Sequence, residues 1–205
     1  MFAIVDNDPA LLDYLRQFKW KSCYKSNNRS NYVATRSAWQ AGRNRSKTVY
    51  MHREVLEFYG VAIDGLQVDH KNRRTLDNRK DNLRPATNMQ NHANMPVRKH
   101  NVAGYKGVIW QQKATGERWH SQIRINGKQR LLGVFPSAEL AAARYNLEAI
   151  RLVGEFAYLN VIPGDPVWVS HNPKEISLPE DPSHLCYIFE QYNRSKKTVL
   201  VNLAA

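Results

Sequence analysis

The chain has 205 residues, of which 42% are hydrophobic, with 10 glycines, 9 prolines and 2 cysteines. This length and composition exclude a collagen-like or low-complexity chain and a small disulfide-stapled domain, and no apolar run is long enough to span a membrane. The formal net charge of +12 indicates a polyanionic partner such as nucleic acid, although a generally basic solvated surface gives the same sum.

The positive charge is unevenly placed along the chain. All of the excess of Lys and Arg over Asp and Glu falls within residues 1–135. A charge spread over such a length fits a long polyanion better than one small acidic ligand. The N-terminus lacks the basic stretch of a secretory signal, and Cys23 and Cys186 form no C-x-x-C pair. We therefore expect a cytoplasmic protein.

Residues 1–60 predict two short helices and several short strands. Asp8 followed by Pro9 is typical of a helix start, and apolar residues at helical spacing continue the helix to Phe18. We expect Trp20 and Trp39 to lie in the core. Strand-like segments and a second helix follow the first helix, at residues 20, 32–34, 48–51 and 55–60.

A polar, Asn-rich segment covers residues 61–94. Within it Asp69 and His70 stand side by side, and two asparagines follow the histidine at offsets of 12 and 21, Asn82 and Asn91. Asp and Asn supply hard oxygen ligands, which suit Mg²⁺ or Mn²⁺ held together with several waters. A neutral imidazole beside such an ion can take a proton from water near pH 7.

A helix is predicted to begin inside this segment. Thr87 and Gln90 have the spacing of a capping box, which places Asn91 in the first helical turn. A strand that ends at His70 and a helix that begins here can converge on one ion. The two spacings together with the cap favour this reading over a solvated Asp-His pair in a polar loop.

At these residues the chain resembles the HNH endonucleases, in the subclass with asparagine at the third motif position. The resemblance covers residues 2–94 and implies that residues 1–94 form a nuclease domain with a ββα-metal core that binds one Mg²⁺ or Mn²⁺ ion. By position in the motif, Asp69 and Asn91 would bind the metal and His70 would be the general base. Asn82 would hold the loop so that the histidine is aimed correctly.

Other residues of the nuclease segment carry less specific expectations. Asn78, Arg79 and Arg84 are expected to contact DNA phosphate or to brace the loop. For three further histidines the choice between assisting the metal and packing stays open, namely His52, His92 and His100.

Residues 95–103 are basic and contain Pro96, so they predict a linker. Residues 104–160 predict a three-stranded antiparallel sheet packed on one helix, with Asn126-Gly127 as a type I′ turn between two of the strands. The predicted strands are residues 105–111, 118–125 and 129–135, and the predicted helix is residues 138–153. Together with the ββα core, this makes the expected fold class α+β.

The middle strand of this sheet has two chemically different faces. Side chains alternate between the faces with period two, which places Trp119 and Ile123 toward the helix. The opposite face is polar and basic, and carries Arg118, His120, Gln122 and Arg124.

Residues 104–160 resemble the Apetala-type (ethylene-response-factor) DNA-binding domain. The likeness rests on Gly104-Tyr105-Lys106-Gly107-Val108, on the middle strand and on Leu132-Gly133-Val134-Phe135. It implies a sheet laid in the major groove of double-stranded DNA. Ile109 and Leu132 stand where the plant pattern has Arg and Trp, so the target sequence does not transfer. The residues expected to contact DNA are Lys106, Trp110, Arg118, Gln122, Arg124 and Arg130.

Residues 161–205 form a C-terminal extension in which we find no chemical motif. Segments 167–169, 185–189 and 198–203 are expected to form short strands or a helix that wraps the preceding domain.

The sequence as a whole predicts a metal-dependent DNA endonuclease that resembles the homing endonucleases of phages and mobile elements. A separate domain would choose the site of cleavage. One active site per chain implies nicking, or double-strand cleavage by a homodimer. A catalytically inert, sequence-specific DNA-binding regulator is the main alternative, and an RNA-binding protein is a weaker one, because the sheet lacks a set of exposed aromatic side chains for stacking bases.

Overall fold

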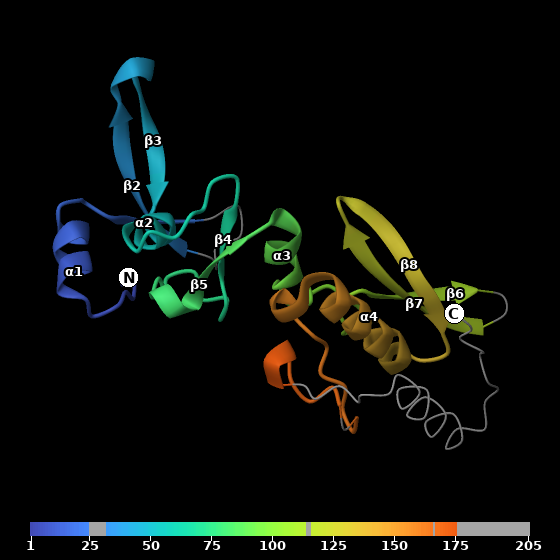
Figure 1. Cartoon of the computed structure of the whole chain (residues 1–205). Helices are drawn as coiled ribbons and strands as arrows, with labels where there is room; N and C mark the ends of the chain where they lie inside the picture. The colour runs from blue at the N-terminus through green and yellow to red at the C-terminus, as the bar shows by residue number, and fades with distance from the viewer. Residues whose placement is uncertain (25–31, 114–115, 166, 176–205) are drawn as a thin grey trace. The chain divides into compact units, whose positions relative to one another are not determined.

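The computed structural model describes residues 1–24, 32–113, 116–165 and 167–175. The chain divides into two compact units, Met1–Met95 and Pro96–Ala205. Both units combine helices with small antiparallel sheets (Figure 1), in agreement with the mixture of helices and strands that the sequence predicts. Among the described residues, no helix has the length and apolar content needed to cross a bilayer.

The first unit contains a three-stranded and a two-stranded antiparallel sheet, with strand orders β1-β2-β3 and β4-β5. Its first helix begins as predicted, because the Asp8 carboxylate accepts hydrogen bonds from the backbone N–H groups of Ala10 and Leu11. The elements are α1 (Pro9–Arg16), β1 (Lys21–Tyr24), β2 (Tyr32–Gln40), η1 (Ala41–Arg43), β3 (Arg45–Tyr50), α2 (Met51–Phe58), β4 (Gln67–His70), η2 (Lys80–Asn82), β5 (Leu83–Ala86) and α3 (Asn88–Ala93).

The core of this unit lies between α1, α2 and the β4-β5 pair, around Leu11, Val55 and Leu56. Trp20 packs against it, as predicted, and its indole Nε1 donates to the Leu15 carbonyl at 3.0 Å. The prediction for Trp39 is wrong: this side chain is 64% exposed. It lies near the far end of the β2-β3 hairpin, which extends away from α2 (Figure 1) and so beyond the core.

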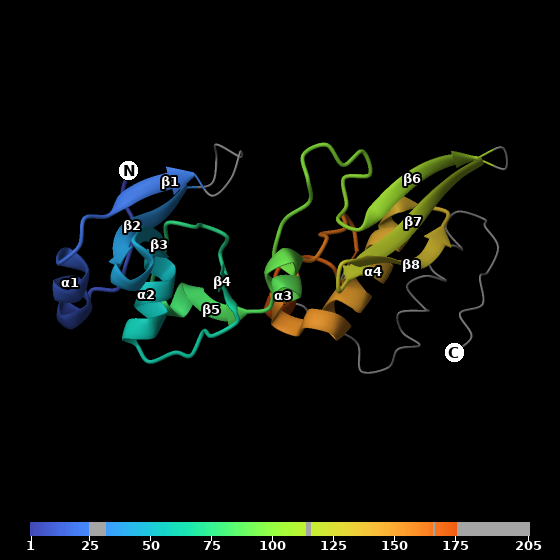
Figure 2. The same ribbon diagram turned by 90° about the horizontal axis from the view of Figure 1, so that it is seen from above.

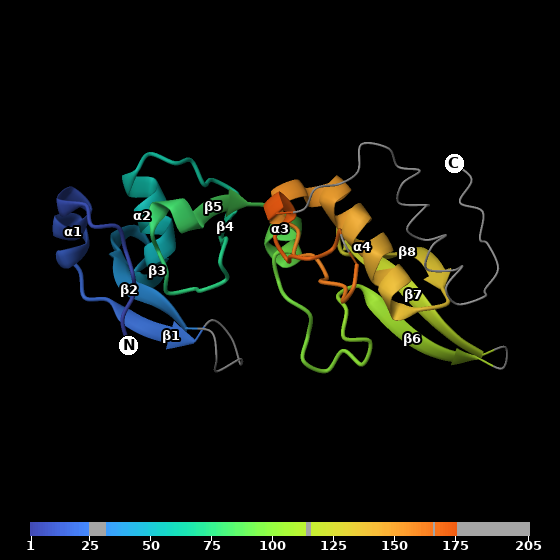
Figure 3. The ribbon, with the colours of Figure 1, turned by 90° about the horizontal axis from the view of Figure 1, so that it is seen from below.

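The second unit contains one three-stranded antiparallel sheet, β6-β7-β8, with α4 packed along it (Figures 2 and 3). The predicted type I′ turn is present, since Asn126 and Gly127 have φ angles of 49° and 80°. Residues 114–115, between β6 and β7, lie outside the described residues. The elements are β6 (Val108–Lys113), β7 (Gly116–Ile125), β8 (Lys128–Phe135), α4 (Ala138–Val153), η3 (Gly154–Phe156) and η4 (Pro173–Glu175).

Helix α4 lies close to the sheet because small residues face it. Ala141, Ala142 and Ala149 are fully or almost fully buried along the helix. Gly107, just before β6, has φ +76°, and a Cβ built on it would lie 2.0 Å from Cδ2 of Tyr145 in α4. A glycine is therefore required here both by the backbone conformation and by the approach of the ring.

Buried asparagines connect α4 to both ends of the 104–160 segment. The Asn146 amide exchanges two hydrogen bonds with the backbone of Asn160, at 2.7 and 2.8 Å. The Asn160 amide in turn exchanges two with the backbone of Lys106, at 2.7 and 3.0 Å. These residues act as one clamp that fixes the start of β6 relative to the helix.

The chain continues to pack on this unit beyond residue 160. Trp168 is buried, and its carbonyl accepts a hydrogen bond from the Ile162 N–H at 2.9 Å. Residues 167–169 form neither a strand nor a helix, so the expectation for them is wrong. The other segments for which strands or a helix were expected, 185–189 and 198–203, lie outside the described residues.

Residues 95–103, predicted as a linker, include a segment bound to the second unit. The Asn101 amide Nδ2 donates to the Tyr105 carbonyl at 2.9 Å, and the Gly104 N–H donates to the Asn101 carbonyl at 3.1 Å. A compact turn therefore leads into β6.

Candidate active site

Two antiparallel strands followed directly by a helix position the Asp-His pair. In the β4-β5 ladder Asp69 lies opposite Arg84, and His70 lies opposite Leu83. One residue, Thr87, separates β5 from α3, and it forms the predicted capping box with Gln90. The pair thus occupies the last two positions of β4, with α3 beginning just after the partner strand ends.

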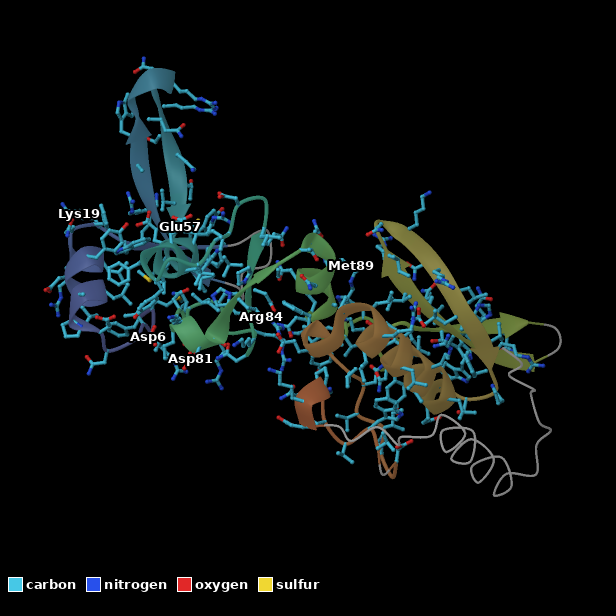
Figure 4. The ribbon with its side chains drawn as sticks, in the orientation of Figure 1. Asp6, Lys19, Glu57, Asp81, Arg84 and Met89 are labelled. Atoms are coloured by element: carbon cyan, nitrogen blue, oxygen red, sulfur yellow. The ribbon has the colours of Figure 1, made fainter. Side chains whose placement is uncertain are left out.

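The Asp69 carboxylate is buried and holds two partners. Arg84 donates to Oδ2 from Nε at 2.9 Å, and the Asn94 amide donates to Oδ1 and Oδ2 at 3.0 and 3.1 Å. Arg84, which Figure 4 labels on β5, is itself buried. Of the two roles expected for Arg84, the structure therefore favours bracing: its guanidinium faces Asp69, and its burial leaves little surface for DNA.

Asn94 is a site residue that the sequence analysis missed. It is buried at the C-terminal cap of α3 and also donates to the His70 carbonyl at 2.9 Å. Its position three residues after Asn91 on the same helix, where side chains share a face, is the signal that points to it.

His70 is buried and oriented by Asn78. The His70 Nε2 lies 3.3 Å from Asn78 Oδ1, while the Asn78 Nδ2 faces two acceptors, the Met51 sulfur at 3.5 Å and the Leu76 carbonyl at 3.4 Å. An amide oxygen can only accept, so this pairing places the imidazole proton on Nε2. Nδ1 is then the basic atom of the ring. The ring of His52 lies edge-on to His70, with centroids 5.3 Å apart.

Asn82 connects the two ends of the loop that follows β4. Its Nδ2 donates to the Asp77 carbonyl at 2.7 Å, and its Oδ1 accepts from the Asn72 N–H at 3.0 Å. Its own carbonyl accepts from the Lys71 N–H at 2.8 Å. These are the contacts expected of a residue that braces the loop.

The N-terminal segment is hydrogen-bonded to the same loop, a contact that the sequence patterns did not predict. The Ile4 N–H donates to Leu76 at 2.8 Å, and the Ile4 carbonyl accepts from the Asn78 N–H at 2.7 Å. The Asp6 carboxylate accepts from the Lys80 N–H at 2.7 Å. Asp6 and Asp81, both labelled in Figure 4, mark these two segments. The backbone of the residue that orients His70 is thus fixed by residue 4.

Asp77 is a buried carboxylate at the centre of the loop. Arg79 donates to its two oxygens at 2.8 and 2.7 Å, and Asn72 donates at 2.8 Å. The hydrogen bonds from Arg79 are the main reason why the pKa of Asp77 is lowered to about 2. Arg79 was expected to contact DNA or to brace the loop; its side chain is 53% exposed but its guanidinium is paired within the loop.

Asp77→Asn is expected to lower the free energy of unfolding by about 1 kcal/mol at neutral pH, because solvent around Arg79 screens the pair. A lowered pKa stabilises the fold above the ordinary carboxyl pKa, and this contribution is lost as pH falls from about 4 to about 2. Urea unfolding at pH 7 and at pH 3 should therefore show a smaller difference between variant and parent at pH 3. Asp13→Asn, which removes an exposed pair with Arg16, is the control. An Asp77→Asn effect no larger than that of the control would contradict the role of Asp77.

The residues expected to bind a metal lie on β4 and α3. Within the described ranges, no three His, Cys, Asp or Glu side chains come together in a way that could hold a metal ion. A cation here would therefore draw on amide oxygens in addition to Asp69. The Asn91 Nδ2 donates to Gln67 Oε1, so the Asn91 Oδ1 is the atom that it can offer to a cation. A carboxylate and an amide oxygen suit Mg²⁺ or Mn²⁺.

The register of the second sheet divides the expected DNA-contacting residues between its two faces. Directly opposed residues share a face, and Arg118, Gln122 and Arg124 lie away from α4 as predicted by their alternation with buried Ser121. Trp110 pairs with Trp119, and Arg130 pairs with Ile123. These two residues therefore lie on the other face.

A bulge explains the correction for Arg130, whereas Trp110 follows from the regular register of β6 with β7. Ser121 lies opposite Gly133 and Gln122 lies opposite Leu131, so Leu132 is an extra residue in β8. Side chains alternate between the two faces along a regular strand, and the extra residue at Leu132 breaks this alternation in β8. Lys106, the remaining expected contact, precedes β6, and its Nζ lies 5.7 Å from the centroid of the Tyr158 ring.

Comparison with known proteins gives one family and two relatives. The family model described as HNH endonuclease matches residues 49–93, which include Asp69, His70, Asn82 and Asn91. An uncharacterised HNH endonuclease of Acanthamoeba polyphaga mimivirus is 30% identical over an alignment of 141 residues, which covers 63% of this chain and 70% of the relative. Protein 3.8 of Escherichia phage T7 is 32% identical over 98 residues, 48% of this chain and 78% of the relative. No solved structure matches the chain significantly.

Proposed function

The chain belongs to the HNH endonuclease family, and we propose that it is a metal-dependent DNA endonuclease of the ββα-metal type, with a separate DNA-binding domain of the Apetala type at residues 104–160. The observation that carries the proposal is the buried Asp69-His70 pair at the end of β4, with His70 held by Asn78. Such a pair places a base beside a carboxylate that can bind a cation.

In the proposed mechanism His70 takes a proton from water at Nδ1, and the resulting hydroxide attacks the scissile phosphorus. The bond to the 3′ oxygen breaks, which leaves 5′-phosphate and 3′-hydroxyl ends. Asn78 keeps Nδ1 as the basic nitrogen through its contact with Nε2, and Asn82 keeps the loop that carries Asn78 closed. Arg84 neutralises part of the Asp69 charge.

Asp69 and Asn91 would hold one Mg²⁺ or Mn²⁺ ion, since each offers a hard oxygen. When bound, the ion supplies positive charge that offsets the charge developing on the phosphate and on the departing oxygen. Because Arg84 and Asn94 already donate to Asp69, we expect metal binding to depend on a shift of these two partners.

Metal removal tests the proposal directly. The purified full chain should convert supercoiled plasmid DNA to open-circular or linear DNA in Mg²⁺ or Mn²⁺, and EDTA should stop the reaction until excess Mg²⁺ is restored. The end product separates nicking by one active site from double-strand cleavage by a homodimer, which would rise steeply with protein concentration. Duplex binding without cleavage in any divalent metal would instead favour the inert DNA-binding regulator.

A further inference from the structure

The face of the β6-β7-β8 sheet that points away from α4 has an apolar centre. Ile109, Leu131 and Val134 are 43%, 56% and 45% exposed. The register places Ile109 and Val134 in one row on either side of His120, and Leu131 beside Gln122 in the next row. Three exposed aliphatic side chains thus form one patch that no described segment of the chain covers.

Polar rows border this patch at both ends. Gln111 lies opposite Arg118 at one end, and Arg124 lies opposite Gln129 at the other. Each end therefore offers one guanidinium and one amide. We call the whole set the sheet face: Ile109, Gln111, Arg118, His120, Gln122, Arg124, Gln129, Leu131 and Val134.

The charge of the surrounding segment indicates a polyanionic occupant. Between residues 103 and 135 the only acidic residue in the sequence is Glu117, whereas Lys and Arg recur throughout. A second copy of this face would bring like charges together, which is unfavourable. Three strands span about 10 Å, close to the roughly 12 Å width of the major groove of B-form DNA.

The side chains on the sheet face match the chemistry of A·T pairs. Glutamine can make two hydrogen bonds to adenine in the major groove, and aliphatic side chains contact the methyl group of thymine. Resting on the proposed DNA-binding role of this domain, we propose that the sheet face selects A·T-rich duplex DNA. Ile109, Leu131 and Val134 contact thymine methyl groups, and Gln122, in the row beside them, pairs with adenine. The arginines at the two ends hold the phosphates or flanking guanines.

Selection from a random duplex library, performed with the full chain in EDTA so that no cleavage occurs, should enrich A·T pairs at adjacent positions. The decisive comparison replaces thymine by uracil in a selected duplex, which removes only the methyl group. Each contacted methyl lost should weaken binding by about fourfold, measured as the Kd by fluorescence anisotropy at fixed salt concentration.

Variants connect this discrimination to the sheet face. Leu131→Ala and Val134→Ala should each reduce the preference for thymine over uracil, and Gln122→Ala should relax the preference for adenine at one position. Val169→Ala is the control for Val134→Ala, because it makes the same substitution at an exposed valine outside the sheet. It should leave the preference for thymine over uracil unchanged.

The outcomes separate this inference from the proposed nuclease. Plasmid cleavage together with G·C-rich selected sites, or with equal affinity for thymine and uracil duplexes, overturns the inference and leaves the nuclease standing. An absence of duplex binding overturns both. A dimer in solution that Leu131→Ala and Val134→Ala dissociate would identify the patch as a contact between copies of this chain, and would also overturn the inference.

Discussion

Replacing His70 with alanine is expected to slow DNA cleavage by about 10²–10⁴-fold, the range typical of general acid-base catalysis. The side chain is buried at the end of β4, and its Nε2 is held at 3.3 Å from Asn78 Oδ1, which leaves Nδ1 as the nitrogen that can accept a proton. Alanine cannot take this proton. The rate is measured as loss of supercoiled plasmid at saturating Mg²⁺.

Duplex binding by the His70→Ala variant should change little, because the side chain contributes one small, buried surface and most of the positive charge lies elsewhere. His171→Ala, which removes an exposed histidine of the second unit, is the matched control and should cleave at the parental rate. Parental cleavage by His70→Ala would remove His70 from the mechanism. Loss of both binding and cleavage would mean that the residue is needed for the folded structure.

Gly107→Ala is expected to lower the free energy of unfolding of the second unit by about 3 kcal/mol or more, the sum of backbone strain at positive φ and overpacking. The new Cβ would meet the Tyr145 ring at 2.0 Å and the Gln122 carbonyl oxygen at 2.7 Å. The ring belongs to a helix fixed by the Asn146-Asn160 clamp, so it has little room to retreat. For a unit of this size, such a loss should lower the Tm by roughly 12–24 °C.

Gly104→Ala is the matched control for the cost of placing alanine at a positive φ. Gly104 has nearly the same conformation, φ +71°, but no atom lies within 4 Å of its Cβ position. The control should lose only about 1–2 kcal/mol. Calorimetry of the full chain measures both changes. Equal losses in the two variants would show that the close approach of Tyr145 costs nothing.

Local signals in the sequence predicted the elements that depend on neighbouring residues. The Asp8 cap, the Thr87-Gln90 capping box and the Asn126-Gly127 turn each satisfy their hydrogen bonds or φ angles within a few residues. For this reason they form where the sequence alone places them. The Thr87-Gln90 capping box also fixes the start of α3, directly after the strand that pairs with Asp69 and His70.

The contacts that could not be predicted are those between segments distant in the sequence. The pattern of apolar residues around Trp39 does not indicate whether the side chain lies at the far end of a hairpin or under a helix. The single extra residue at Leu132 places Arg130 on the opposite face, because the alternation of side chains along a strand is shifted by one residue at a bulge. Asn94 was missed because its partners, Asp69 and the His70 carbonyl, lie on β4.

The pairing of Ile4 with Leu76 and Asn78 bears on the order in which the protein folds. Joining segments more than 70 residues apart costs loop-closure entropy, so we expect this pairing to form after the more local contacts of the helices and strands between them. The loop that orients His70 is then among the last parts of the first unit to become rigid. A chain that has lost its first few residues would keep α1 and α2 but lack the backbone contacts of Ile4 with the loop, so its base would be less firmly aligned.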